Sequence, residues 1–439
     1  MRQRSIITGV AALAVATMYF VVPASAAVRT APEPGPGPGP AQVRGRSSDG
    51  LRHAPVEVAQ PKGPGVVEHP LFLNVFSYAG VNATPMVTTT AGPSGYFPSV
   101  IKGMLGLTGD GTGQTIAIVT AYDHPYIVQD LATFNATFGL PAPPSFTKVT
   151  QTGATTGYPA PDAGWALETS LDVQWAHAIA PKASIVLIEA KTSGYADMMT
   201  ALAYAGGTKV AASVISNSWG SAEFSTQSTY DAKCKLTTKL CVFSTGDYGN
   251  PGSYPAYNPY VLAVGGTTLN LSIALNGSTV VDSETSWSGS GGGLSLYAAK
   301  PAYQNAVNTY TKRGTSDVSY NADPATGVPV YSSYPYNGQV GWYQMGGTSA
   351  GAPQWAGILA VVNQQRVAAR KAVLSAQPSS GVFKAHTAIY GLTSGIADII
   401  SGPSNGTCGA ICTPRAGYDF VTGRGSPRSG IEAALKATP

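Results

Sequence analysis

The sequence predicts an α/β fold in which a doubly wound, mostly parallel sheet carries helices on both faces. Short runs such as 113–123 and 183–190 are apolar along their whole length, and segments with helical periodicity separate them. Strands that are buried on both faces and alternate with helices are typical of parallel sheets. In such sheets the functional residues collect at the carboxyl ends of the strands.

The predicted elements alternate along most of the chain, starting near Ser94. The predicted strands are 113–123, 183–190, 210–216, 241–245 and 261–268. The predicted helices are 127–138, 162–180, 196–205, 226–240 and 354–369. The last helix can begin as early as Ser349, because Pro353 is tolerated in a first turn.

The N-terminal residues indicate export. Residues 1–26 have a basic start, an apolar run and an Ala24-Ser25-Ala26 cleavage site, which together predict a secretory signal peptide. A membrane anchor is the alternative interpretation. No other segment has the length and apolar character to span a bilayer, so we expect a secreted, extracellular protein without membrane contact. Residues 27–93 include a Pro/Gly alternation typical of a linker, which leaves 94–439 for the folded domain.

Composition gives a weak indication of an acidic environment. Only 11% of the residues are charged, against about 25% in an average globular protein. With 22 acidic residues, the chain has few ion pairs to lose when the pH falls. The net charge of +4 is spread out, and without a basic cluster we expect no nucleic-acid partner.

The four cysteines form two closely spaced pairs, Cys234 with Cys241 and Cys408 with Cys412. In an exported protein this pattern predicts two local disulfides. A zinc site is the alternative for the second pair, but no nearby His or further Cys completes four ligands.

A candidate nucleophile lies in the sequence GGTSAGAP, residues 346–353. A serine at the start of a helix lies beside unpaired backbone N–H groups and the positive end of the helix dipole. That environment suits Ser349 as a nucleophile whose product is an oxyanion. The alternative is an ordinary N-cap, since serine is a favoured capping residue.

Three carboxyl groups complete the candidate site. Glu168 and Asp172 lie four residues apart, on one face of a helix that also carries Trp165 and Trp175. Two like charges on a buried face must share a proton or engage a partner, whereas a solvated acidic face is the alternative. Asp247 follows the strand 241–245 between two glycines, where an Asx-turn is equally compatible. The sequence SNSWG, 216–220, ends the preceding strand in the same way and could offer backbone to a substrate, or be a plain loop.

Together these motifs resemble the sedolisin family of serine-carboxyl peptidases. The resemblance covers about 94–431 and includes, in order, GLTGDGTGQTIAIV, ALETSLDVQWAHAIAP, SNSWG, FSTGDYG, VLAVGGTTL, GGTSAGAP and GYDFVTGRG. It implies a subtilisin-like fold and a serine-type endopeptidase or tripeptidyl-peptidase acting on proteins or peptides. It also implies the catalytic roles: Ser349 as nucleophile, Glu168 as general base, Asp172 orienting Glu168, and Asp247 in the oxyanion hole.

The carboxyl chemistry favours acid. A carboxylate has an unperturbed pKa of about 4, so Glu168 can accept a proton where a histidine is already charged. Asp172 allows the pair to keep one proton between them. Asp247 donates to an oxyanion only while it is protonated. We therefore expect an optimum of about pH 3–5.

The resemblance further implies one structural calcium ion in a C-terminal loop region. The matching positions are Asp398, Ile399, Arg415, Gly417 and Asp419. Carboxylates and backbone carbonyls are hard oxygen ligands of the kind that calcium prefers. Arg415 stands where the family has a glycine, and a carbonyl ligand tolerates that change.

Two alternatives remain for function. A subtilisin-type Ser/His/Asp protease would use Asp123 with a histidine, but His124 and His177 do not lie in the expected motif. An inactive secreted binding domain would lack a catalytic side chain, and none is missing. The family's large prodomain has only the short segment 27–93 as its counterpart. We expect a monomer.

Overall fold

A mostly parallel sheet of eight strands organises the part of the chain that the computed structural model describes, residues 92–376 and 383–439. The strand order is β10-β6-β5-β4-β1-β3-β2, and β7 pairs with β6 in antiparallel fashion. The other pairings in this sheet are parallel, which confirms the predicted fold class. The predicted signal peptide, 1–26, and nearly all of the predicted linker lie outside the described residues.

The sheet and its helices have the following bounds. The strands are β1 (Thr115–Ala121), β2 (Phe146–Thr150), β3 (Ser184–Ala190), β4 (Val214–Asn217), β5 (Leu240–Ser244), β6 (Val261–Ile273), β7 (Thr279–Ser286) and β10 (Val318–Asn321). The helices are α1 (Pro98–Leu105), α2 (Ile127–Phe138), α3 (Ala163–Ile179), α4 (Tyr195–Gly206), α5 (Thr348–Ala368), α6 (Lys384–Tyr390) and α7 (Ile431–Ala437). Smaller antiparallel pairs are β8 (Gly293–Ala299) with β9 (Lys312–Thr315), β11 (Val328–Tyr336) with β12 (Gln339–Met345), and β13 (Ile396–Ala397) with β14 (Ser426–Pro427).

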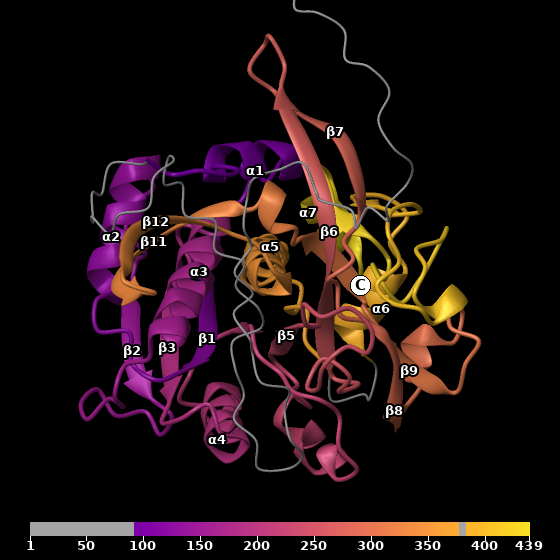
Figure 1. Ribbon diagram of the computed structural model, residues 1–439, viewed down its shortest axis with the longest axis horizontal. Coiled ribbons are helices and arrows are strands. Elements are labelled where there is room, and N and C mark those ends of the chain that lie inside the picture. Colours follow the sequence, from indigo (N-terminus) through magenta and orange to yellow (C-terminus); the bar gives the residue numbers. More distant parts are fainter. Residues whose placement is uncertain (1–91, 377–382) are drawn as a thin grey trace, which may run out of the picture. The chain divides into compact units, whose positions relative to one another are not determined.

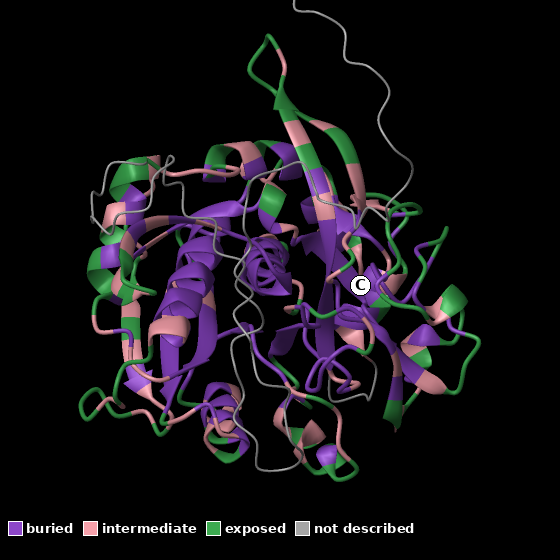
Figure 2. Ribbon diagram, in the orientation of Figure 1, coloured by how far each residue is buried: buried purple, intermediate pink, exposed green. Residues whose placement is uncertain are grey.

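Both faces of the sheet are covered by helices (Figures 1 and 2). Side chains of a strand point alternately to opposite faces, so neighbouring residues of β1 enter different cores. Ile116 and Ile118 pack into the core that contains α3 and α5, whereas Ala117 and Val119 pack into the one that contains α4. The uniformly apolar strands of the sequence are explained by this double burial.

The order of the strands reverses beside β1. The chain first builds β2 and β3 on one side of β1, and then places β4, β5 and β6 on the other side. In open α/β sheets, ligands bind outside the carboxyl ends of the strands near such a reversal. The carboxyl ends of β4 and β5 lead directly to Ser218 and Asp247.

The segment 226–240 contradicts the predicted helix. It forms only a short 3-10 helix, Gln227–Lys233, before β5 begins at Leu240. A helix through 240 would separate residues 234 and 241 by about 10 Å along its axis. Their Cα atoms are 5.9 Å apart, because Cys234 and Cys241 form a disulfide. The covalent link therefore excludes the longer helix.

Other predicted elements differ in their bounds. The strand predicted at 210–216 begins only at Val214, and the one predicted at 261–268 continues to Ile273, where it pairs with β7. The helix predicted at 354–369 begins six residues earlier, at Thr348. Cys408 and Cys412 form the second predicted disulfide, so the zinc alternative is wrong. Within the described ranges, no helix is long and apolar enough to cross a membrane.

Candidate active site

Ser349 is the second residue of α5, because the helix begins at Thr348 and is preceded by Gly347 at the cap position. The φ angle of Gly347 is 89°, a conformation that residues with a side chain rarely adopt. A Cβ on Gly346 would lie 2.5 Å from the carbonyl oxygen of Ala322. The two glycines thus allow a sharp entry into the helix, and the N-cap interpretation of Ser349 is wrong.

Pro353 gives Ser349 an unusual backbone environment. In a regular helix the N–H of residue 353 would donate to the carbonyl oxygen of residue 349. Proline has no N–H, so that bond is absent, and Pro353 lies beyond the first turn rather than within it. The hydroxyl of Ser218, after β4, lies within hydrogen-bond distance of this carbonyl oxygen, at 3.3 Å.

Glu168 and Asp172 lie on a helix that is buried along almost its whole length, so the solvated-face alternative is wrong. Every residue from Trp165 to Ile179 is buried, and both carboxyl groups have no exposed area. The helix packs against α5 and β1, and Asp162 caps its start by accepting from the N–H of Trp165. The two acids therefore lie inside the protein.

Burial controls the charge of this pair. Burial and the neighbouring Asp172 raise the pKa of Glu168 well above its usual value, while a hydrogen bond from the Ser349 side chain opposes this. Burial likewise raises the pKa of Asp172, and a hydrogen bond from Ser218 opposes it. The Ser218 Oγ and Asp172 Oδ1 atoms are 2.6 Å apart. A pair with both pKa values raised retains at least one proton in acid.

Asp247 reaches across to the start of α5. Its Oδ1 accepts hydrogen bonds from the N–H and the hydroxyl of Thr348, each at 2.7 Å. The Thr348 hydroxyl in turn accepts from the N–H of Gly246 at 3.1 Å. Asp247 therefore does not cap its own loop, as an Asx-turn would require. Burial raises its pKa to about 7, although the bonds from Thr348 oppose the rise.

The second oxygen of Asp247, Oδ2, is buried and has no hydrogen-bond partner within the described part of the chain. A protonated carboxyl group can donate from this oxygen while Oδ1 still accepts from Thr348. Such a neutral acid is suited to contact a developing negative charge next to Ser349.

The three described histidines are engaged elsewhere. His177 bonds the carbonyl oxygen of Pro141 at 2.8 Å, and His386 bonds that of Val261 at 2.7 Å. His124 lies 2.8 Å from the Ser170 hydroxyl and 3.2 Å from Asp130 Oδ2. These contacts do not support a Ser/His/Asp triad.

The remaining member of the subtilisin alternative, Asp123, forms an ion pair with Lys148. The burial of His124 against Asp130 could not be predicted from the sequence, because that contact joins a loop to α2. His53 and His69 lie outside the described residues.

The structure brings the five predicted calcium positions together. The N–H of Gly417 donates to Asp398 at 2.6 Å, and the N–H of Arg415 donates to Asp419 at 3.2 Å. The Thr422 hydroxyl lies 3.0 Å from Asp419 and 3.5 Å from the carbonyl oxygen of Ile399. Five residues from two loops thus surround one region.

The oxygen atoms of this region are ligands of the kind that calcium prefers, but the Arg424 side chain competes for one of them. Two carboxylates and three carbonyl oxygens are hard ligands. The guanidinium of Arg424, however, donates to the carbonyl oxygen of Gly417 at 2.8 Å. No group of three or more His, Cys, Asp or Glu side chains suited to a metal occurs among residues 92–376 and 383–439.

Comparison with known proteins first relates the fold and the candidate site to a broad class of proteins. A family model described as the subtilase family matches residues 161–377, which contain all four candidate catalytic residues. The solved structure of Pseudomonas sedolisin, a serine-carboxyl proteinase complexed with two molecules of pseudo-iodotyrostatin, is similar with a TM-score of 0.65 and 26% identity. That similarity covers 79% of this chain and 99% of the sedolisin chain.

Comparison with curated sequences indicates a narrower group of relatives within this class. Kumamolisin of Bacillus sp. (strain MN-32) is 33% identical over 58% of this chain and 50% of its own length. Sedolisin of Pseudomonas sp. (strain 101) is 28% identical over 75% of this chain and 58% of its own length. The chain thus spans about half the length of these curated relatives. With the structural similarity, these matches support the sedolisin family for this chain.

Two contacts of the site were not anticipated from the sequence. The motif 216–220 indicated only a backbone contribution, whereas the side chain of Ser218 bonds Asp172. The role of Thr348 in holding Asp247 was also missed. The available signals were the position of Ser218 at the carboxyl end of a strand and the proline four residues after Ser349.

Proposed function

We propose that this chain is a serine-carboxyl peptidase that hydrolyses peptide bonds through an acyl-enzyme on Ser349. One observation carries the proposal: four buried side chains meet at the start of α5. The Ser349 side chain lies near enough to Glu168 to lower the pKa of that acid, Asp172 lies one turn further along α3, and Asp247 bonds the residue before the serine. The alternatives, a histidine-based protease and an inactive binding domain, have no comparable support.

The reaction begins with attack of the Ser349 hydroxyl oxygen on the carbonyl carbon of the substrate, while Glu168 accepts the hydroxyl proton. Protonated Asp247 donates to the resulting oxyanion. The C–N bond then breaks, and the amine leaves with the proton that Glu168 returns. A water molecule attacks the acyl ester and gives a proton to Glu168. The ester C–O bond then breaks, Glu168 returns this proton to the Ser349 oxygen, and the acid is released. Asp172 orients Glu168 throughout.

The proposed peptidase is active at acidic pH. Asp247, with a pKa of about 7, is neutral throughout the predicted range of about pH 3–5. Glu168 must lose its proton to act as a base, and its raised pKa favours the upper part of that range. Asp172 can carry the one proton that the pair retains, which leaves Glu168 free to act.

The proposal also includes the location, the oligomeric state, the domain bounds and the calcium ion of the peptidase. The chain acts outside the cell as a monomer on proteins or peptides, after removal of residues 1–26, and 94–439 is the peptidase domain. One calcium ion would be held by the side chains of Asp398 and Asp419 and the carbonyl oxygens of Ile399, Arg415 and Gly417. The ion would neutralise the carboxylates and connect the two loops.

Digestion of an acid-denatured protein at about pH 4 tests the activity. The secreted protein should cleave the substrate, whereas Ser349→Ala and Glu168→Gln should each lower kcat by roughly 10⁴-fold or more, since both act directly in the chemical step. Lys239→Met changes a buried side chain outside the site. It therefore shows whether a change at a buried position is enough by itself to lower cleavage. Equal cleavage by the wild type and both site variants would end the proposal, and so would an optimum near pH 8.

A further inference from the structure

The hydroxyl of Ser218 lies between the acid pair and the nucleophile. It is 2.6 Å from Asp172 Oδ1 and 3.3 Å from the carbonyl oxygen of Ser349. Ser218 is almost completely buried, at 1% exposure, directly after β4. Its position is therefore fixed by the sheet, while its two partners belong to α3 and α5.

A hydroxyl group has a single proton to donate and can accept at the same time. Ser218 therefore cannot donate to both oxygens. When Asp172 is ionised, the charged carboxylate is the stronger acceptor and takes the proton of Ser218. When Asp172 is protonated, it can donate to Ser218, which can then donate to the Ser349 carbonyl oxygen.

The arrangement in which Ser218 donates to the Ser349 carbonyl oxygen depends on Pro353. Since residue 353 has no N–H, the carbonyl oxygen of Ser349 lacks its helical donor. The Ser218 hydroxyl lies 3.3 Å from this oxygen and can donate to it in place of residue 353. The same proline thus keeps this oxygen available to a donor from outside the helix.

We propose that Ser218 is a positioning residue that couples the protonation of Asp172 to the backbone of the nucleophile. In the ionised state Ser218 holds Asp172, and in the protonated state it holds the first turn of α5 at Ser349. The inference rests on the proposed peptidase function and adds a residue to it. Ser218 acts through Asp172 and Ser349 and does not itself react.

The charged and titratable groups around α3 are few, and only some of them bear on Ser218. On the site's side these are Glu168, Asp247 and the His124–Asp130 pair that contacts Ser170, and at the far end His177 with Lys102 of α1. Among these groups and the acid pair, the Ser218 hydroxyl bonds Asp172 and also lowers the pKa of Glu168. Its removal should therefore act on the acid pair first.

The pH profile of kcat/KM is the first test. Ser218→Ala removes a donor to ionised Asp172 and so raises the pKa at which the pair loses its last proton. In an Asp247→Asn background, where residue 247 no longer titrates, the alkaline limb should therefore move upward by about half to one pH unit. We also expect kcat to fall by roughly 10-fold with little change in KM, because substrate contacts remain. Ser218→Thr keeps the hydroxyl and should restore both the limb and kcat.

Ser216 provides a matched control on the same strand. Its hydroxyl is fully buried and has no hydrogen-bond partner among the described residues. Ser216→Ala should leave the profile unchanged. An unmoved limb in Ser218→Ala, or an equal shift in Ser216→Ala, would overturn the inference.

Thermal melting provides a readout that does not depend on activity. Removing Ser218 weakens the ionised form of Asp172, so the Tm loss of Ser218→Ala should be larger at pH 8 than at pH 4. In a Pro353→Ala background the helix supplies its own donor to Ser349, and the loss at pH 4 should become smaller. The same loss at both pH values and in both backgrounds would contradict the coupling.

The two readouts separate the inference from the function on which it rests. A wild type that is inactive at every pH defeats the proposed function, while the melting comparison still decides the role of Ser218. An active wild type, an inactive Ser349→Ala and an unaltered Ser218→Ala defeat this inference alone.

Discussion

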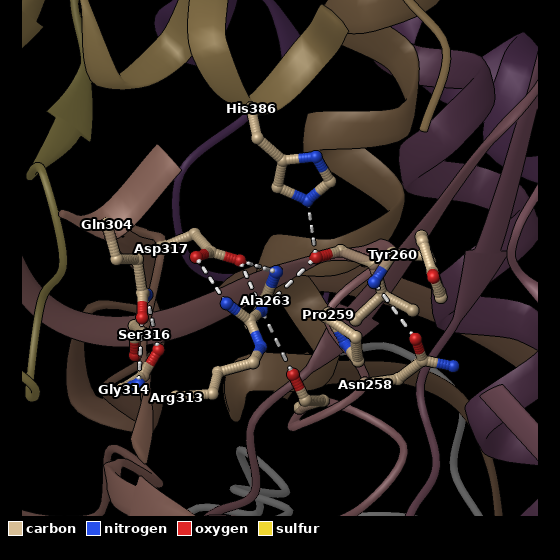
Figure 3. A network of polar contacts seen from close by, with 12 residues as sticks. Asn258, Pro259, Tyr260, Ala263, Gln304, Arg313, Gly314, Ser316, Asp317 and His386 are labelled. Carbon is tan, nitrogen blue, oxygen red and sulfur yellow. Dashed lines mark hydrogen bonds and ion pairs between the residues drawn. The ribbon is translucent and has the colours of Figure 1, made fainter. Parts of the chain in front are cut away.

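In two buried regions of this protein, carboxyl groups have pKa values shifted in opposite directions. In the network drawn in Figure 3, Asp317 has no exposed area and lies against Arg313, with distances of 3.1 and 2.8 Å to the guanidinium. Burial alone would raise the pKa of Asp317, but the charge and hydrogen bonds of Arg313 outweigh it, and the pKa is lowered. Asp317 is therefore ionised.

The candidate active site is equally buried, yet its acids behave differently. The pKa values of Glu168, Asp172 and Asp247 are all raised, mainly by burial. No Lys or Arg among the described residues forms an ion pair with them. In these two regions, the buried acid that bonds a guanidinium has a lowered pKa, whereas the three buried acids without a cationic partner have raised pKa values.

The largest effect should come from removing the cation. Arg313→Met leaves Asp317 as a buried carboxylate without its partner, which costs about 3–5 kcal/mol of unfolding free energy at pH 7. A lowered pKa contributes stability above the unfolded pKa that is lost as the pH falls. The loss should therefore shrink toward pH 4, where Asp317 of the variant can take up a proton. Chemical denaturation at both pH values measures this.

The double variant Arg313→Met with Asp317→Asn is the control. It removes both charges, so most of the pH dependence of the loss should disappear. If Arg313→Met loses the same free energy at pH 4 and pH 7, the ion pair does not have the role assigned to it.

A smaller effect is expected from Asp247→Asn, which separates the protonation of residue 247 from its hydrogen bonding at the active site. Asp247→Asn keeps an acceptor for Thr348 and a permanent donor for the oxyanion. In the wild type, activity should fall as the pH rises through about 7, because Asp247 then loses its proton. In the variant this limb of kcat/KM should move to higher pH, although the maximal rate falls by about 10-fold.

Asp247→Ala is the matching loss of function, since it removes the donor altogether. We expect a decrease of about 10²–10³-fold in kcat at the optimum. An alkaline limb that stays in place in Asp247→Asn would assign that limb to the pair of Glu168 and Asp172 instead.

The sequence was sufficient for features that depend on local pattern. Apolar strands indicated the parallel sheet, and the spacing of Glu168 and Asp172 placed both acids on one buried face of α3. The position of Asp247 after a buried strand correctly placed it at the carboxyl end of β5. Each of these follows from the periodicity of a single element.

Features that depend on contacts between distant segments could not be predicted. The bond between Ser218 and Asp172 joins residues 46 apart, and the bond between Asp247 and Thr348 joins residues 101 apart. The helix predicted at 226–240 is wrong for a different reason, because it is incompatible with the local disulfide between Cys234 and Cys241 that the sequence also predicted. Tertiary constraints override local preference in these places.

The C-terminal loops extend the comparison to a third acid, with the smallest expected effect. Asp419 is buried, and both its oxygens accept from groups of its own loop, namely the N–H groups of Arg415, Val421 and Thr422 and the Thr422 hydroxyl. Since neutral donors already satisfy Asp419, the loop does not collapse without a cation. Removing calcium with EGTA should therefore lower Tm by only about 2–4 °C.

Asp398 and Arg424 distinguish this outcome from a general effect of the chelator. Asp398→Asn should abolish the Tm response to calcium, because it removes one of only two carboxylates. Arg424→Leu frees the carbonyl oxygen of Gly417 from a competing positive charge, so less calcium should be needed for the same rise in Tm. A Tm that ignores calcium in the wild type and rises with it in Arg424→Leu would mean that the guanidinium already stabilises this loop in place of the ion.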